Sequence, residues 1–166
     1  MKNDEPAYFA VPDPDTGDMT YWYRDRRGII NPWPPKVGRY GPRMPSVAGL
    51  SRDDRDAVVR DFVLSTAKPW RERVMACLEA NPDEAAARFA VFQSRCCLCS
   101  KALTDAKSKV FGIGPDCREG LPASLLGCMA REMGRIHAQA TSADTEILPP
   151  ATEEPTMTIK RSEPAD

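Results

Sequence analysis

The sequence has little of what an enzyme needs. It contains one histidine, His137, so no Ser–His or Cys–His pair is apparent, and it has no glycine-rich phosphate loop followed by lysine. Residues 112–114, Gly-Ile-Gly, are too short for a dinucleotide-binding motif. Catalysis by side chains requires a nucleophile with its base, or a paired acid and base. We therefore expect a protein that is not an enzyme and has no small-molecule substrate.

Long apolar runs are also missing. No stretch approaches the ~20 apolar residues that span a bilayer, and residues 1–6 lack the apolar core of a secretory signal. We expect no membrane partner and a cytoplasmic protein. Because thiols stay reduced in that compartment, the six cysteines, five of them within 33 residues, indicate metal binding rather than a set of disulfides.

Net charge is nearly absent. The formal value of −1 gives no general reason to expect binding to nucleic acid or membranes. The distribution is uneven, because residues 141–166 hold six acidic and two basic residues, which leaves about +3 on residues 1–140. Residues 141–166 are short of aromatics and rich in Thr, Glu and Pro, so we expect a disordered acidic tail.

Sixteen prolines and ten glycines confine regular structure to a few segments. Residues 7–25 predict a β-hairpin around an Asp- and Pro-rich turn, and residues 28–30 predict a short third strand. The carboxylates of that turn lack EF-hand spacing, so we interpret it as a solvated turn. Trp22, Trp33 and Tyr40 have two interpretations. They form either the core of the small sheet or, with nearby Arg and Lys, a stacking surface for single-stranded nucleic acid.

Helical periodicity begins at residue 51. A cap at Ser51 opens a helix to about residue 64, and a second helix begins near residue 68 and places Cys77 on its apolar stripe, as a core residue. Residues 81–84, Asn-Pro-Asp-Glu, open a third helix. This helix should pack through Ala85, Phe89 and Phe92. Pro122 opens a fourth helix, whose stripe is Leu125, Leu126, Met129, Met133 and Ile136.

The predicted fold class is α+β, in four parts along the chain. Residues 1–50 form a small β module with Pro-rich coil, and residues 51–94 a helical segment. Residues 95–140 form a zinc-binding module with a C-terminal helix, and residues 141–166 are the tail.

The cysteine cluster carries the strongest signal. Cys96 and Cys99 form the C-x-x-C of a zinc knuckle, in which two thiolates bind one metal and a tight turn points N–H groups at the sulfurs. Ser100 stands where glycine is more usual and strains this turn. Cys117 follows 18 positions after Cys99, behind two glycines and Pro115, at a predicted helix start. The pattern predicts a treble-clef-like site: a knuckle, a small hairpin, then a ligand at a helix start.

The fourth ligand is less well defined. Cys128 is the leading candidate if the chain folds back over residues 120–122, but it lies beside an apolar stripe and fits a packing role equally. Cys97, next to Cys96, is an alternative, and so is His137. A carboxylate or water completes the set of alternatives.

The string C-x-x-C-[GS]-[KR]-x-L-T-D-x-x-S-x-x-x-G-[IY]-G-P-x-C, which ends at Cys117, resembles a small zinc-binding domain family of unknown function, DUF6011. The match begins at Arg95 and covers 23 of 166 residues. Ser100 and Ala106 stand where glycine and proline are common in this family. The resemblance implies Zn²⁺ binding and a phage or actinobacterial origin, with no established activity.

Two functions fit these features. Basic residues outnumber acidic ones in the zinc module, which favours a zinc-binding accessory protein, phage-encoded, that contacts nucleic-acid phosphates through Lys101, Lys107, Lys109 and Arg118. The alternative is an adaptor or inhibitor that docks on a host protein complex, for which the aromatic, Pro-rich coil and the acidic tail are suited.

Overall fold

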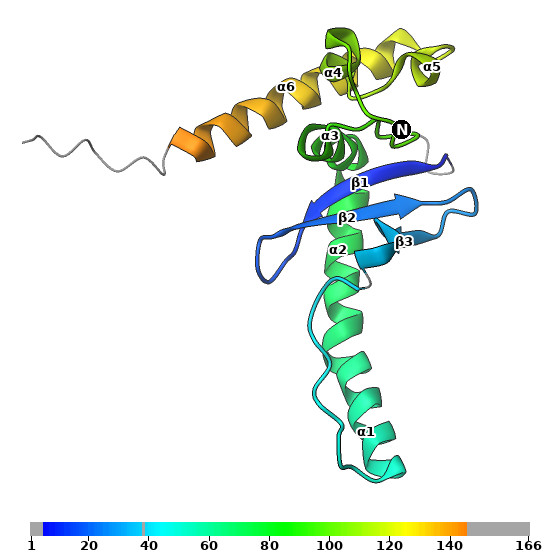
Figure 1. The fold of residues 1–166 in the computed structure, drawn as a ribbon, viewed down its shortest axis with the longest axis vertical. Helices are drawn as coiled ribbons and strands as arrows, with labels where there is room; N and C mark the ends of the chain where they lie inside the picture. Colours follow the sequence, from blue (N-terminus) through cyan, green and yellow to red (C-terminus); the bar gives the residue numbers. More distant parts are fainter. Residues whose placement is uncertain (1–4, 38, 146–166) are drawn as a thin grey trace, which may run out of the picture.

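A computed structural model describes residues 5–37 and 39–145 of the chain, with side chains up to residue 142. A small antiparallel sheet lies across one end of a long helical rod, and a second long helix passes over that end and runs off to one side (Figure 1). The small sheet, the helices and the cysteine cluster followed by a last helix confirm the predicted α+β class.

The sheet consists of β1 (Ala7–Pro12), β2 (Met19–Arg24) and β3 (Ile30–Pro32), in that order. The predicted hairpin is confirmed, with Phe9 opposite Trp22, and the third strand falls two residues later than expected. Alternate residues of β2 point inward. One of them, Thr20, donates to the Val11 carbonyl and accepts from the indole N–H of Trp22, so its hydroxyl is satisfied inside the sheet's core face.

We expected a solvated hairpin turn, but one of its carboxylates is buried. Asp13 is 9% exposed, and its carboxylate accepts from the Asp15 N–H at 2.8 Å and the Trp70 indole at 3.1 Å. Burial raises the pKa of Asp13, but these hydrogen bonds outweigh it and hold the pKa below the ordinary value. Asp13 therefore fixes the hairpin turn to the helical rod.

The rod is built from α1 (Arg52–Phe62), a π-helical turn η2 (Val63–Ala67) and α2 (Lys68–Ala80), which run end to end (Figure 1). Ser51 caps α1 by accepting from the Asp54 N–H, as predicted. The short 3-10 helix η1 (Pro35–Val37) and the coil after it precede the rod. The buried face of α2 is Trp70, Val74 and Leu78, whereas Cys77 is exposed. The prediction of Cys77 as a core residue was wrong, because the i, i+4, i+8 stripe passes beside it.

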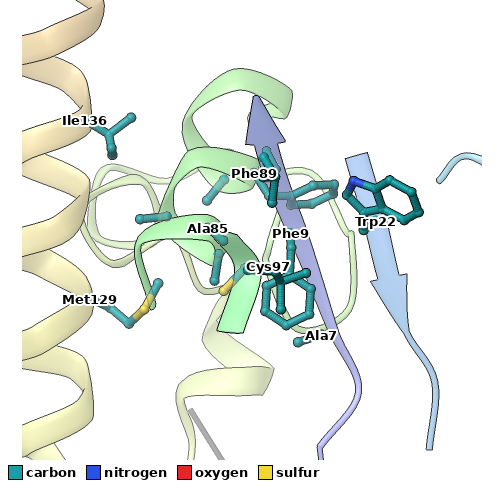
Figure 2. Packing of buried hydrophobic residues seen from close by; sticks show 14 of the residues in the cluster. Ala7, Phe9, Trp22, Ala85, Phe89, Cys97, Met129 and Ile136 are labelled. Carbon is teal, nitrogen blue, oxygen red and sulfur yellow. The ribbon is translucent and has the colours of Figure 1, made fainter. Parts of the chain in front are cut away.

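Helix α3 (Pro82–Gln93) is the centre of the protein. Its small residues bring it close to β1 on one side and α6 on the other (Figure 2). Phe89 is fully buried, with its ring 5.2 Å from that of Tyr8 and 5.1 Å from that of Trp33. Phe92 is 47% exposed, against our expectation. The buried face is centred on Ala86 and Ala90, and at ~100° per residue Phe92 points well away from it.

The chain between Cys99 and Cys117 contains a short helix and does not form the expected hairpin. The only strand pairing described there is a single bridge between Arg95 and Ala102. Asp105 then caps α4 (Ala106–Phe111) by accepting from the Ser108 N–H at 2.8 Å. Because Asp105 satisfies an end N–H of a helix, the Thr-Asp pair opens a helix where we expected strands.

Helix α5 (Pro115–Arg118) is one turn long, and α6 (Ala123–Thr145) follows it. Met129, Met133 and Ile136 of α6 are buried, and Leu125 and Leu126 are half-buried against the same cluster. The helix continues past residue 140, where we expected it to end. The rest of the expected tail, residues 146–166, lies outside the described residues. No helix in the described part of the chain has the length and hydrophobicity to cross a membrane.

Gly112 shows how closely these helices pack. Its φ of +66° is a left-handed conformation, and a Cβ there would lie 2.8 Å from both the Ala90 Cβ and the Met133 Sδ. Only glycine meets both demands. One hydrophobic cluster thus runs from β1 through α3 and the cysteines to α6, and it crosses the boundaries expected at residues 50 and 94.

An ion cluster also joins α3 to α6. Glu84, 15% exposed at its side chain, accepts from Arg135 of α6 at 2.8 Å and pairs with Arg88 in its own helix. Burial raises the pKa of Glu84, but the Arg135 hydrogen bond and both arginine charges bring the net value below the ordinary one. The charged carboxylate therefore stabilises the fold.

We expect Glu84→Gln to lower the free energy of unfolding by about 1–2 kcal/mol at neutral pH, because it removes a charge that two arginines share. A depressed carboxylate pKa contributes stability that is fully present above the unfolded pKa of about 4.3 and is lost as the pH falls through the folded value. The difference between the two proteins should thus be constant above pH ~5 and shrink at lower pH. Urea unfolding from pH 3 to 7 measures this, and a difference that stays constant to pH 3 would contradict it.

Candidate metal centre

The sulfur atoms of Cys96, Cys99 and Cys117 lie within 4.8 Å of one another, and among the described residues they form the one group of this kind. For an ion bound tetrahedrally about 2.3 Å from each thiolate, as zinc is, the sulfurs must be about 3.8 Å apart. The triad can reach this spacing with small side-chain adjustments. Three close cysteines that could hold a metal ion are therefore present where the sequence placed them.

The turn after Cys96 has the geometry of a knuckle. The Cys96 N–H donates to the Lys101 carbonyl at 2.8 Å, and the Ser100 N–H donates to the Cys96 carbonyl at 2.8 Å. Ser100 has a φ of +56°, so the conformation that favours glycine is present, and a residue with a Cβ adopts it at some cost. The strain expected at Ser100 is therefore explained by its left-handed backbone conformation.

Backbone N–H groups converge on Cys96, the most buried of the three. Burial raises the pKa of Cys96, yet hydrogen bonds from the N–H groups of Gly114, Leu98 and Cys99 more than offset it, and the net pKa is lowered. Gly114 comes close enough that a Cβ there would lie 4.0 Å from the Cys96 Cβ. The fold thus supplies dipoles that stabilise a thiolate at Cys96, as the knuckle pattern predicted.

The surroundings of Cys117, unlike those of Cys96, disfavour the thiolate. It lies in α5, directly behind the Gly114–Pro115 helix start that the sequence predicted. Burial and then its contacts with Cys99 and Cys96 raise the pKa of Cys117 to about 12, because a second negative charge beside the first is unfavourable. A divalent cation reverses this effect by neutralising both charges. The arrangement of the three thiols therefore suits a bound cation.

Cys97 belongs to the core and not to the triad. Figure 2 shows it between Ala85 of α3 and Phe9 of β1. Burial and the neighbouring Cys96 raise the pKa of Cys97 well above its ordinary value, which keeps a neutral thiol. Its backbone accepts from the Tyr8 N–H at 2.7 Å and donates to the Gly112 carbonyl at 3.1 Å. These bonds hold the backbone so that Cys96 faces the other two sulfurs of the triad and Cys97 faces the core.

Cys128, our leading candidate for the fourth ligand, lies apart from the triad. Its thiol donates to an Asp83 carboxylate oxygen at 3.5 Å, at the start of α3. Burial and this carboxylate raise the pKa of Cys128, so the group is a protonated donor rather than a thiolate. His137 is exposed on α6. The structure brings neither of them into the group of three sulfurs.

The basic residues around the triad have different surroundings. Lys101 pairs with Asp116 at 3.1 Å, both about three-quarters exposed, and that hydrogen bond raises the pKa of Lys101. Lys107 and Lys109 are exposed on α4. Arg118 instead points inward, where it donates to the Ser108 hydroxyl at 3.1 Å and the Ile113 carbonyl at 3.2 Å. Arg118 was one of the four residues predicted to contact phosphates. Its guanidinium instead joins α4 to α5.

Two contacts at the site could not be predicted from local sequence patterns. The Lys101–Asp116 pair joins residues 15 positions apart, and the Asp83–Cys128 bond joins residues 45 positions apart. In each case only the folded structure shows which two residues are in contact. Asp116 could have been noticed as the residue next to a ligand, but its partner could not.

Comparison with known proteins agrees with the sequence resemblance. Residues 86–122 match the model of a family of unknown function, DUF6011. The match spans the second half of α3, the knuckle, α4 and α5, and so includes all three cysteines of the triad. No curated protein and no solved structure matches the chain. The family match identifies this segment as a recurring unit, without an activity.

We expect the purified protein to bind one metal ion per chain, and separate Cys96→Ser, Cys99→Ser and Cys117→Ser changes to abolish stoichiometric binding. Removing the ion from the native protein should lower the thermal midpoint, because structural metal binding contributes to folding. Cys77→Ser and Cys128→Ser are the matched controls and should keep the ion, since neither thiol joins the triad. Elemental analysis by mass spectrometry measures the content. A Cys128→Ser protein without metal would contradict this assignment.

Proposed function

From the three cysteines inside a domain whose family has no assigned function, we propose that the protein is a zinc-binding, non-enzymatic accessory protein that contacts nucleic acid. The triad supports the metal part of the proposal. Thiolate sulfurs select zinc, copper(I) or iron–sulfur clusters, and a C-x-x-C knuckle with a distant third cysteine supplies three of the four ligands that structural zinc sites use. Zinc here fixes α4 and α5 to the core that α3 and α6 form.

The location of Lys107 and Lys109 supports a nucleic-acid contact. Both are exposed on α4, which lies beside α6, on the other side of α3 from the sheet (Figure 1). Exposed lysines neutralise phosphates without reading sequence, so the expected binding is electrostatic and salt-dependent. Lys101 contributes less, because Asp116 already balances its charge.

We expect Lys107→Ala combined with Lys109→Ala to weaken DNA binding and to reduce the slope of log affinity against log salt by about 2, since each phosphate contact contributes ~0.9. Fluorescence anisotropy on single- and double-stranded DNA at 50–200 mM salt measures this. The matched control is Arg39→Ala with Arg43→Ala, which removes the same charge elsewhere. Absence of affinity at low salt would refute nucleic-acid binding and leave the zinc assignment intact.

A groove between the coil and the rod favours a second candidate, a protein-binding adaptor. It has a volume of about 680 Å³ and lies where the coil after η1 runs beside α1 and α2 (Figure 1). The charged residues that line it in the described chain are all arginines, Arg39, Arg43 and Arg71. Their sign indicates an acidic partner.

The residues at the floor of this groove favour a protein partner over a nucleic acid. Trp22 and Trp70 line it but are 1% and 4% exposed, so their faces cannot stack with bases as single-strand binding requires. Half-buried Tyr40 is held by its hydroxyl, which donates to the Trp33 carbonyl at 2.8 Å. An apolar side chain flanked by carboxylates fits this surface better than a base does. If the chain is phage-encoded, the partner is a host protein complex.

We expect Arg39→Glu with Arg43→Glu to weaken binding of a labelled peptide, one leucine flanked by glutamates, by at least ~10-fold, because the change repels the carboxylates. Lys107→Glu with Lys109→Glu is the matched control and should leave the affinity unchanged. A second peptide with glutamine in place of glutamate tests the role of charge. Equal binding of both peptides would argue against an acidic partner.

A further inference from the structure

We propose that the metal centre keeps one coordination position for a neutral donor from outside the chain. Water occupies this position in the isolated protein, and the imidazole of a partner protein's histidine replaces it in a complex. This inference rests on the zinc site proposed above and adds what completes it.

The described chain supplies three sulfur donors and no fourth nitrogen or sulfur donor. All six cysteines and the one histidine lie within the described residues. Beyond the triad, Cys97 is buried in the core and Cys128 is bonded to Asp83, while Cys77 and His137 are exposed on α2 and α6. Since the rest of the sequence holds no cysteine or histidine, a fourth ligand of either type must come from another molecule.

Asp116 is the carboxylate next to the site, and its contacts argue against a role as ligand. It precedes Cys117 in α5, but it does not join the group of atoms within 4.8 Å of one another. Its Oδ2 instead pairs with Lys101 at 3.1 Å, with the side chain 76% exposed. Adjacent residues of a helical turn point in directions ~100° apart, so a carboxylate beside Cys117 is aimed away from the ion that Cys117 binds.

The outer side of the triad is accessible. Cys96 is fully buried, whereas Cys99 and Cys117 are half-buried. An ion held by all three would therefore be most accessible on the side of Cys99 and Cys117. Three thiolates and Zn²⁺ carry a net charge of −1, and an anionic fourth ligand would raise this to −2. Lys101 is already paired with Asp116, and a neutral donor completes the site without adding to this negative charge.

The same charge argument favours docking over hydrolysis. Zinc with neutral imidazole ligands lowers the pKa of bound water to about 7. Three thiolates donate far more charge to the ion, so water bound beside them stays protonated and leaves without a proton transfer. An exchangeable neutral ligand of this kind suits replacement by a histidine of a partner. Metal coordination would then add to the contact that the surrounding surface makes.

The test replaces zinc with Co²⁺ in the full chain, because the visible absorption of Co²⁺ reports its ligands. Titration with imidazole, the probe, should shift the bands saturably at millimolar concentration and reverse on dilution. Electron–nuclear double resonance in H₂O and D₂O should show exchangeable protons of bound water that imidazole removes. The matched variants are Asp116→Asn, Cys128→Ser and His137→Gln. Each should keep the starting spectrum and an imidazole midpoint within about twofold of the native value.

Several results would overturn the proposal. Bands that imidazole leaves unchanged up to ~100 mM, or bound Co²⁺ without exchangeable protons, would show that the chain itself fills the position. A variant that alters the starting spectrum would identify the residue that does so. Failure to bind Co²⁺ or zinc at all is a separate outcome, because it refutes the zinc site on which the inference rests.

Discussion

Two backbone hydrogen bonds at Cys97 determine where the cysteine triad lies relative to the rest of the protein. The carbonyl of Cys97 accepts from Tyr8 in β1, and its N–H donates to the carbonyl of Gly112 at the end of α4. Cys97 thereby links strand β1, through Tyr8, to the end of α4, through Gly112. Because the Cys97 thiol is buried against α3, the neighbouring Cys96 faces the other way, toward Cys99 and Cys117. The position of the site is thus a consequence of core packing.

The segment from α4 to α5 is short and has few buried side chains of its own, so it depends on Gly112 packing against Ala90 and Met133. An ion bound by the triad would add a second attachment, because Cys117 lies in this segment and Cys96 and Cys99 lie in the knuckle. Arg118 completes this segment from within, since its guanidinium reaches Ser108 and the Ile113 carbonyl. A charged residue next to a ligand is easily taken for a contact to an external anion. Here its hydrogen-bonding groups are engaged by the domain itself.

The sequence predicted the parts of the fold that depend on local signals. The hairpin, the caps at Ser51 and Asn81, the knuckle and the helix start at Pro115 follow from residues close together in the chain. The errors fall where a partner far away in sequence decides. Cys77 and Phe92 have apolar side chains at helical spacing, yet the neighbouring elements reach only one side of each helix. Asp13 was expected in solvent because its partner Trp70 is 57 residues away. Helix α4 was missed because a segment of six residues has a weak helical signal.

The choice of a fourth ligand also depends on contacts that the sequence alone does not reveal. Cysteine counting suggested a closed site of four thiolates, and counting alone could not separate Cys128 from Cys97. Folding separates them by giving each thiol a different neighbour, a carboxylate for Cys128 and an apolar core for Cys97. Both neighbours favour the protonated thiol, whereas the N–H groups around Cys96 favour the thiolate. The position that folding gives each sulfur, rather than its spacing in the sequence, therefore distinguishes the three clustered cysteines from Cys97 and Cys128.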